Sequence, residues 1–303
     1  MPLRSLMATA LLALLAGSAC HRATPSGNAP SAPRPTAAAR TAARTALPPL
    51  RIVSYNIRHG RGMDDQVNLA RTGEVLRRLD ADLIGLQEVD DRVRRSGGVP
   101  QADSLGAALG MHAAFGAFMP YQGGRYGLGL LSRFPITRTT ALRLPDGNEP
   151  RVALAAEIVI PPFADTVVAI VVHFDWVEDD GFRYPQAQVV AAAVDTIRHP
   201  VILLGDFNDD PASRTLALFR ARAQELPKPV EDHFTFSSTK PDQEIDYIFL
   251  RGSTRWVPLR TEVITEPLAS DHRPLVGLIA RTPRRQRYSS TIREVSRVSG
   301  IRA

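Results

Sequence analysis

Four apolar runs in this chain each lead directly into polar side chains that can take part in a reaction. The run Val201 to Leu204 leads into the tetrapeptide Gly-Asp-Phe-Asn (205–208), and the others lead to Asn56, Glu88 and His173. Apolar runs of this kind are typical of buried β-strands. A carboxylate at the end of a buried strand is costly unless it is paired, protonated or bound to a metal. We therefore expect these strand ends to converge on one polar site, which we interpret as catalytic.

Strand-like and helical patterns alternate between residues 51 and 281, and no Gly/Ser-rich linker or internal repeat separates them. Two segments show one apolar face at helical spacing: Leu69 to Leu79, with Asn68 as the expected cap, and Gln186 to Ile197. The expected strands are Arg51–Ile57, Leu83–Glu88, Gly129–Ser132, Val152–Ile160, Thr166–His173, Val201–Leu204, Ile245–Leu250 and Leu275–Ala280. Wholly apolar strands mixed with helices predict one α/β domain, in which buried sheets are covered by helices.

Short motifs in this domain carry a family resemblance. In chain order they are Ser54-Tyr55-Asn56, Gln87-Glu88-Val89, Gly129-Leu130-Leu131-Ser132-Arg133, Gly205-Asp206-Phe207-Asn208, Ile245-Asp246-Tyr247 and Ser270-Asp271-His272. With these motifs the chain resembles the endonuclease/exonuclease/phosphatase superfamily, which includes abasic-site nucleases, neutral sphingomyelinases and inositol-polyphosphate 5-phosphatases. The resemblance covers residues 51–281. It implies a four-layer sandwich of two packed mixed β-sheets flanked by helices, and a metal-dependent hydrolase of phosphate esters.

The N-terminal segment indicates an exported bacterial member of this family. Residues 1–20 combine Arg4, an apolar core and a small-residue stretch that ends at Cys20, the only cysteine, as in a signal peptide. Cys20 resembles the lipidated residue of bacterial lipoproteins, although Gly17 replaces the usual Leu three residues before it. The expected locations are therefore the cell envelope with a lipid anchor, the outer membrane included, or secretion after cleavage behind Ala19.

The basic character of the chain belongs to its two ends. The formal net charge is +6, but residues 1–50 contribute five Arg and no acid, and residues 282–303 contribute six Arg and one Glu. The middle of the chain therefore carries about −4, which gives no support for a broad nucleic-acid track. We expect residues 21–50, rich in Ala and Pro, to be a disordered tether. We expect residues 282–303 to be a disordered basic tail, and both ends to favour anionic lipid or envelope polymer.

Glu88 and Asn56 are the expected metal ligands. Mg²⁺ prefers oxygen ligands and typically takes one or two protein carboxylates together with water and substrate phosphate. Both residues match metal-site positions of the resembled family, and Asp271, which lies next to His272, is a further expected ligand. Mn²⁺ suits the same oxygens, whereas the sequence holds no cluster of Cys and His that suggests zinc.

Asp206 and Asn208 are expected to act directly on the phosphoester. If the segment is extended, residues two apart point to one face, so that Asp206 can deprotonate a water while Asn208 donates to a phosphate oxygen. Gly205 allows a close backbone approach at this point. The alternative interpretation is a turn, because Gly, Asp and Asn are all common turn formers.

His272 completes the expected catalytic group and needs a partner that fixes its ring. Asp246 and the adjacent Asp271 are the two alternatives for this partner. In the resemblance, His272 contacts the scissile phosphate and stabilises the charge that develops on it. His173 matches a family position that hydrogen-bonds the phosphate, and Arg151 matches an inward-facing arginine that binds substrate.

Two further features of the sequence bear on substrate contacts. Arg58 and His59 follow Asn56 and either reach substrate anions or are simply solvated. At Leu128 the chain departs from the Asn that many relatives carry, which affects substrate contacts rather than core chemistry. The chain has no Gly-x-Ser-x-Gly motif and no Walker loop, so acyl transfer and nucleotide-driven motors are poor alternatives.

The sequence therefore predicts an exported Mg²⁺-dependent phosphoesterase that hydrolyses phosphodiesters by in-line attack of a water activated by Asp206. The substrate is left open between nucleic acid and a phospholipid head group, and no protein partner is evident. Two alternatives remain, a nuclease that acts on DNA or RNA and a catalytically inactive protein that binds a phosphorylated ligand.

Overall fold

The computed structural model describes residues 48–161, 165–252 and 256–281. By its internal contacts the chain separates into two units, Met1–Arg44 and Thr45–Ala303, and the first lies outside the described residues. The predicted signal peptide, Cys20 and the basic tail lie outside them as well. The first strand already begins at Leu50, which is fully buried and so belongs to the folded unit rather than to the predicted tether.

The first sheet contains six strands in the order β11-β12-β1-β2-β4-β3. Only β1 and β2 are parallel, so the sheet is mixed. Its strands are β1 (Leu50–Asn56), β2 (Leu83–Asp91), β3 (His112–Tyr121), β4 (Gly124–Ser132), β11 (Trp256–Val263) and β12 (Leu275–Arg281).

The second sheet also contains six strands, in the order β5-β6-β7-β8-β10-β9. Its one parallel pair is β7 with β8. Its strands are β5 (Ile136–Arg143), β6 (Val152–Ile160), β7 (Asp165–His173), β8 (Val201–Asp206), β9 (Gln224–Glu225) and β10 (Asp246–Arg251).

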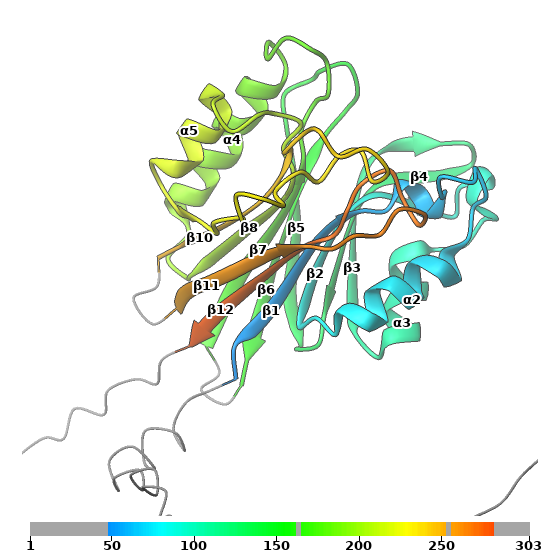
Figure 1. Cartoon of the computed structure of the whole chain (residues 1–303), viewed down its shortest axis with the longest axis horizontal. Helices are drawn as coiled ribbons and strands as arrows, with labels where there is room; N and C mark the ends of the chain where they lie inside the picture. The colour runs from blue at the N-terminus through cyan, green and yellow to red at the C-terminus, as the bar shows by residue number, and fades with distance from the viewer. Residues whose placement is uncertain (1–47, 162–164, 253–255, 282–303) are drawn as a thin grey trace, which may run out of the picture. The chain divides into compact units, whose positions relative to one another are not determined.

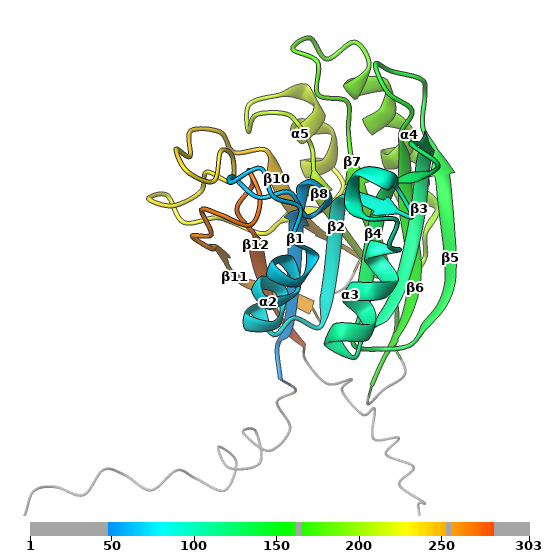
Figure 2. The same cartoon turned by 90° about the vertical axis from the view of Figure 1, so that its right-hand side faces the viewer.

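The two sheets pack face to face, and helices cover their outer faces (Figures 1 and 2). Helices α2 (Leu69–Leu79) and α3 (Gln101–Leu109) lie on the first sheet, and α4 (Arg183–Thr196) and α5 (Arg214–Arg220) lie on the second. Three separate apolar clusters fill the spaces between these four layers, one between the sheets and one under each helix pair. Two short 3₁₀ turns, Arg58–Gly60 and Arg94–Ser96, complete the described elements. The predicted four-layer α/β sandwich is therefore confirmed.

Local sequence signals were reliable where a strand or helix face is buried. All eight expected strands overlap observed ones, and Asn68 caps α2 by accepting a hydrogen bond from the backbone N–H of Arg71 at 3.0 Å. The elements that the sequence pattern did not indicate are β3, β5, β9, β11, α3 and α5. Strand β5 lies at a sheet edge and exposes most of its side chains, so its polar sequence lacks an apolar run.

The carboxyl ends of β1 and β8 meet, although the two strands belong to different sheets. The side chains of their last residues, Asn56 and Asp206, are in hydrogen-bond contact. This edge of the sandwich carries the polar residues that the sequence predicted. Among the helices of the described residues, none is long and apolar enough to cross a membrane.

Candidate active site

Glu88 lies on a β-bulge rather than at the end of a strand, as the sequence had suggested. Strand β2 continues to Asp91, and its pairing with β4 shifts register between Leu86 and Val89. Glu88 takes a left-handed backbone conformation with φ 57°, which is uncommon for a residue with a side chain. A bulge re-aims a side chain without ending the strand. Here it turns the Glu88 carboxylate towards Asn56, whose Nδ2 donates to Glu88 Oε1 at 3.2 Å.

Asp206 is the centre of the observed cluster. It is the last residue of β8, and its side chain is only 1% exposed. Sheet pairing places it directly opposite His173 of β7 and Asp246 of β10, so the three residues form one row across adjacent strands. Asp206 Oδ2 accepts a hydrogen bond from Asn56 Nδ2 at 3.2 Å and lies 3.5 Å from His173 Nε2. Strand register therefore explains why residues from distant sequence positions meet here.

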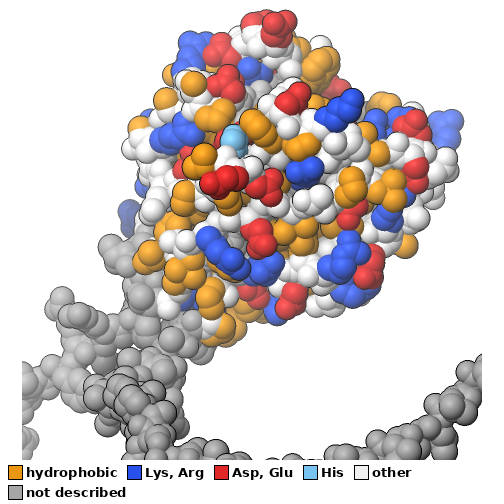
Figure 3. All heavy atoms as spheres, viewed as in Figure 1, with side chains coloured by type: hydrophobic (Ala, Val, Ile, Leu, Met, Phe, Trp, Pro, Cys, Tyr) orange, Lys and Arg blue, Asp and Glu red, His pale blue; other side chains and the backbone are white. Residues whose placement is uncertain are grey.

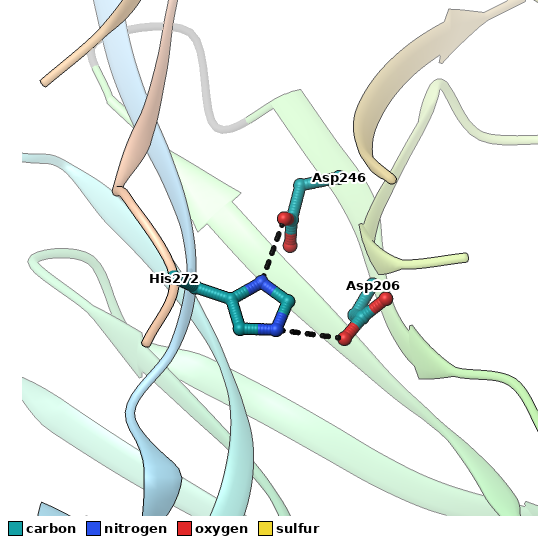
Figure 4. A group of neighbouring side chains, drawn as sticks. All are labelled: Asp206, Asp246 and His272. Carbon is teal, nitrogen blue, oxygen red and sulfur yellow. Dashed lines mark hydrogen bonds and ion pairs between the residues drawn. The ribbon is translucent and has the colours of Figure 1, made fainter. Parts of the chain in front are cut away.

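His272 bridges the two carboxylates of this row (Figure 4). Its Nδ1 lies 2.9 Å from Asp246 Oδ2, and its Nε2 lies 3.5 Å from Asp206 Oδ2. The ring partner is therefore Asp246. The other alternative, Asp271, instead forms an ion pair with Arg58, Oδ2 to Nε at 3.3 Å.

The charges in this group shift the pKa values of His272 and Asp206. Burial lowers the pKa of His272, but the charges of Asp246 and Asp206 and the Asp246 hydrogen bond outweigh it and raise this pKa to about 10. Burial raises the pKa of Asp206 to about 7, helped by Asp246 and opposed by His272 and by hydrogen bonds from Asn208 and Asn56. The two carboxylates therefore favour the protonated form of His272, and burial favours the neutral form of Asp206.

His173 is held in the opposite state. Arg151 Nη1 lies 3.2 Å from His173 Nδ1, and because a guanidinium only donates, Nδ1 must accept and Nε2 carries the proton. Burial, together with the positive charge of Arg151, lowers the pKa of His173 well below its usual value. Arg151 is 1% exposed and also pairs with Glu149 at 3.2 Å. Arg151 thus contacts His173 from within the protein, and its predicted role in substrate binding stays a prediction.

Asn208 does not continue the extended strand, so the turn interpretation was the correct one. Its φ is 49°, its backbone N–H donates to Asp206 Oδ1 at 2.9 Å, and its side-chain amide donates to the carbonyl of Phe174 at 3.0 Å. A carboxylate that accepts from the N–H two residues later is a common turn former. Gly205 is required for the approach of β7, because a Cβ at this position would lie 2.0 Å from the carbonyl oxygen of Val172.

Arg58 and His59 lie at the site, and a buried glutamine supports their turn. Both residues have left-handed φ values of 46° and 44°, and His59 Nδ1 lies 3.9 Å from Glu88 Oε2. Gln101, fully buried at the start of α3, donates to the carbonyl of His59 at 2.8 Å and accepts from the N–H of Asp90 at 2.9 Å. No sequence pattern indicated Gln101, because its partners are backbone groups brought together by the fold.

Two places in the site offer ligand atoms for a metal ion: the group of Asp206, Asp246 and His272, and the carboxylate of Glu88. Asp206, Asp246 and His272 place one ligand atom each within 4.8 Å of one another, a spacing that an ion can span. Both ring nitrogens of His272 already face these two carboxylates, however, Nδ1 at 2.9 Å from Asp246 and Nε2 at 3.5 Å from Asp206. Glu88 fits better. Burial opposes its ionisation, but the nearby His59 ring, the hydrogen bond from Asn56 and the charge of His272 lower its pKa to about 2.

Glu88, Asn56 and Asp271, the three predicted metal ligands, lie around the end of β1. The Glu88 side chain is 24% exposed, so an ionised carboxylate faces space where water and a phosphate can complete the coordination of a hard cation. Asn56 turns its NH₂ group to Glu88 and Asp206, while its Oδ1 accepts from the N–H of Arg58 at 3.1 Å. Ser270 donates to the Asn56 carbonyl at 2.7 Å and fixes the end of β1 next to Asp271. The roles of Asn56 and Asp271 as metal ligands stay predictions.

The fold and the site together define a class of protein, the two-sheet α/β sandwich with a buried carboxylate–imidazole cluster at the edge where β7 and β8 end and β10 begins. The family model described as the endonuclease/exonuclease/phosphatase family matches residues 53–272. The chain therefore belongs to the endonuclease/exonuclease/phosphatase family, whose members are metal-dependent hydrolases of phosphate esters, and the predicted enzyme class is confirmed.

Solved structures share this fold at low sequence identity. The endonuclease/exonuclease/phosphatase from Beutenbergia cavernae DSM 12333 is 21% identical with a TM-score of 0.66, and the match covers 78% of this chain and 72% of that one. The mannosyl-6-phosphatase of Bacteroides thetaiotaomicron VPI-5482 is 19% identical with a TM-score of 0.62, over 76% and 99% of the two chains. The human Nocturnin catalytic domain, with a bound sulfate anion, is 19% identical with a TM-score of 0.61, over 78% and 94%. A comparison with curated protein sequences found no significant match.

Proposed function

We propose that this protein is an exported Mg²⁺-dependent phosphoesterase that hydrolyses phosphodiesters, with Asp206 as the group that orients and deprotonates the attacking water. The observation that carries the proposal is the environment of Asp206. Its buried carboxyl has a pKa raised to about 7, and two imidazoles approach one of its oxygens at 3.5 Å. A base whose pKa lies near the working pH is the most effective in proton transfer.

The neighbouring residues divide the remaining work. Asp206 takes a proton from the attacking water. The oxygen of that water forms a bond to phosphorus while the bond from phosphorus to the leaving oxygen breaks. No covalent intermediate forms on the enzyme. The His272 imidazolium, fixed by Asp246 at 2.9 Å, stabilises negative charge on the phosphoryl oxygens. The His173 Nε2–H group donates to the same oxygens, and Arg151 keeps that nitrogen protonated by occupying Nδ1. Asn208 is the further donor in this proposal.

Glu88 would hold the metal ion, with Asn56 and Asp271 as the further ligands. Mg²⁺, or Mn²⁺ in its place, would there supply positive charge that offsets the charge on the phosphoryl and leaving oxygens. Support comes from the family assignment and from the depressed pKa of Glu88, which keeps the carboxylate ionised at every working pH. Arg58, bound to Asp271 at 3.3 Å, completes the polar rim on this side.

The test of the chemistry uses the full chain. Hydrolysis of bis(p-nitrophenyl) phosphate and p-nitrophenyl phosphate is measured with Mg²⁺, with Mn²⁺ and with a chelator, for the wild type and for Asp206→Ala. We expect metal-dependent turnover of the diester that is lost in the variant. Equal turnover by Asp206→Ala and the wild type would refute Asp206 as the base, and a faster monoester would make the enzyme a phosphatase.

Export and lipid anchoring belong to the same proposal and rest on the sequence of residues 1–20. In a bacterial host, the wild type should incorporate radiolabelled palmitate and fractionate with membranes, whereas Cys20→Ala should do neither. Label in neither protein, with the wild type free in the medium, would indicate secretion without an anchor.

A further inference from the structure

A cavity opens at Asn208, beside the row formed by His173, Asp206 and Asp246. It encloses about 460 Å³ and is lined by residues 176–178, 208–211, 233–234 and 242–245, together with Arg183; we call it the side pocket. Most of these segments follow β7 or β8 or lead into β10. The pocket wall is therefore built from loops next to the strands that carry His173, Asp206 and Asp246. Asn208 borders the pocket and donates its backbone N–H to Asp206. The side pocket therefore adjoins the site through Asn208, while His173, Asp206 and Asp246 do not line it.

An exposed indole forms part of the pocket wall. Trp176 is 58% exposed, the most exposed large aromatic among the described residues, and Phe234, on another segment of the pocket wall, is 36% exposed. The Phe234 ring packs against His233 with centroids 4.1 Å apart. An indole face that is left open to a ligand cavity attracts cations more strongly than other aromatic faces do.

The charges of the pocket are predominantly negative. Glu178, Asp210 and Asp242 are exposed, and within the described residues none of them has an ion-pair partner. The two other acids of the wall are neutralised, Asp209 by Arg183 at 3.0 Å and Glu244 by Lys228 at 2.8 Å.

This charge disfavours a second phosphate in the pocket. Like charges in partly buried space repel by several times the thermal energy, so a neighbouring phosphate of a polynucleotide would be repelled here. Figure 3 shows acidic and basic side chains interspersed over the visible face of the described residues, with no continuous basic stripe along it.

We propose that the side pocket receives the organic group of the substrate and that this group carries a cationic nitrogen. The substrate is then a compact phosphodiester with an ammonium head group, whose nitrogen lies over the Trp176 ring and near the unpaired carboxylates. This inference rests on the proposed phosphoesterase function and narrows its substrate class. It makes Trp176 a residue that determines specificity rather than one that takes part in the bond-breaking step.

Binding can be tested without turnover, because the chain has only two tryptophans. Trp256 is buried, so Trp256→Phe leaves Trp176 as the single fluorophore while the exposed indole is untouched. Phosphocholine, inorganic phosphate and thymidine 5′-monophosphate are titrated into this full-length variant in the presence of Mg²⁺. We expect phosphocholine to change the Trp176 emission with an affinity about fivefold to tenfold higher than that of either other ligand.

Specificity is tested by turnover of two p-nitrophenyl diesters, one of phosphocholine and one of thymidine 5′-phosphate. The wild type should prefer the choline ester, and Trp176→Leu should lower the ratio of the two kcat/KM values about fivefold to tenfold. Glu178→Gln combined with Asp242→Asn should lower the same ratio, with a smaller effect at high salt. The control variants are Phe182→Leu, an exposed aromatic that does not line the pocket, and Asp103→Asn on α3; both should keep the wild-type ratio.

The outcomes separate this inference from the function on which it rests. Turnover of both esters with no preference, or with a preference for the thymidine ester, overturns the inference and leaves the phosphoesterase in place. Equal losses on both esters in Trp176→Leu overturn it as well. A phosphocholine response of Trp176 without turnover of any ester supports the pocket and refutes the proposed chemistry, and the absence of both refutes the two together.

Discussion

The carboxylates of Glu88 and Asp206 lie on either side of Asn56 in one site, but their pKa values are shifted in opposite directions. Both accept from the same Nδ2 at 3.2 Å, yet the pKa of Glu88 falls to about 2 and that of Asp206 rises to about 7. The Glu88 side chain is 24% exposed and receives further stabilisation from His59, whereas that of Asp206 is 1% exposed and faces Asp246. Pairs of acids pushed apart in this way indicate separate roles. Glu88 is suited to hold a cation, and Asp206 to accept a proton.

The two carboxylates also differ in how the fold presents them. Asp206 lies in a regular row across β7, β8 and β10, where sheet pairing alone sets its neighbours. Glu88 depends on a bulge and a left-handed residue in β2. A strained backbone position persists only where surrounding structure maintains it, so the metal side of the site is the more specialised of the two.

The largest effect is expected from Asp206→Asn, which removes the proton acceptor and keeps the shape. Loss of a general base typically costs about 10²–10⁴ in rate, so we expect kcat to fall about 10³-fold at saturating Mg²⁺. Steady-state kinetics with bis(p-nitrophenyl) phosphate measure this, and no metal concentration should restore the rate. Thermal unfolding serves as the control for folding. A variant with more than a tenth of wild-type kcat would contradict the assignment.

Glu88→Gln should change the metal dependence of the rate, whereas Asp206→Asn should change the rate at every metal concentration. Removing the ionised ligand should raise the Mg²⁺ concentration for half-maximal activity about 10–100-fold, with part of the activity recovered at high Mg²⁺. A metal titration of the rate distinguishes this from Asp206→Asn. If the two variants have the same metal dependence, the division of roles between the carboxylates is wrong.

Asp246→Asn should produce an intermediate effect through the ring of His272. The amide keeps the hydrogen-bond geometry but loses the charge that helps to raise the pKa of His272 to about 10. We expect the pKa of this imidazole, measured by NMR, to fall and kcat to drop about 10-fold or more. The Mg²⁺ concentration for half-maximal activity should stay unchanged. Asp103→Asn is the control, since Asp103 is an exposed residue of α3 and has no contact with the ring. An unchanged His272 titration in Asp246→Asn would exclude Asp246 as the positioning residue.

The smallest effect belongs to a carboxylate remote from the Glu88–Asp206 pair. The hydrogen bond from Arg71, helped by the N–H of Gln66, lowers the pKa of exposed Asp64 from 3.8 to about 2. A depressed pKa stabilises the fold above the unfolded value, and the contribution is lost as pH falls from about 4 towards 2. Asp64→Asn should therefore lower the free energy of unfolding slightly at pH 7, and the difference should vanish near pH 2. Urea denaturation at both pH values measures it, and catalytic rates should stay at wild type.

The sequence by itself determined the buried strands, the cap at Asn68, the family and the kinds of side chain that gather at the site. These signals are local, because an apolar run or a cap is specified by residues within one element. Glu88, Asp206 and His173 were indicated because each interrupts or follows an apolar segment with a group that is costly to bury alone, and His272 was indicated by its Ser-Asp-His motif.

Only the tertiary structure decided how these groups are paired and charged. The row of His173, Asp206 and Asp246, the choice of Asp246 over Asp271, the bulge at Glu88 and the turn at Asn208 all depend on contacts with other segments of the fold. Strand register across a sheet is set by the packing of whole faces rather than by local sequence. Burial and neighbouring charges then shift each pKa, which is why two similar acids in one chain are suited to different roles.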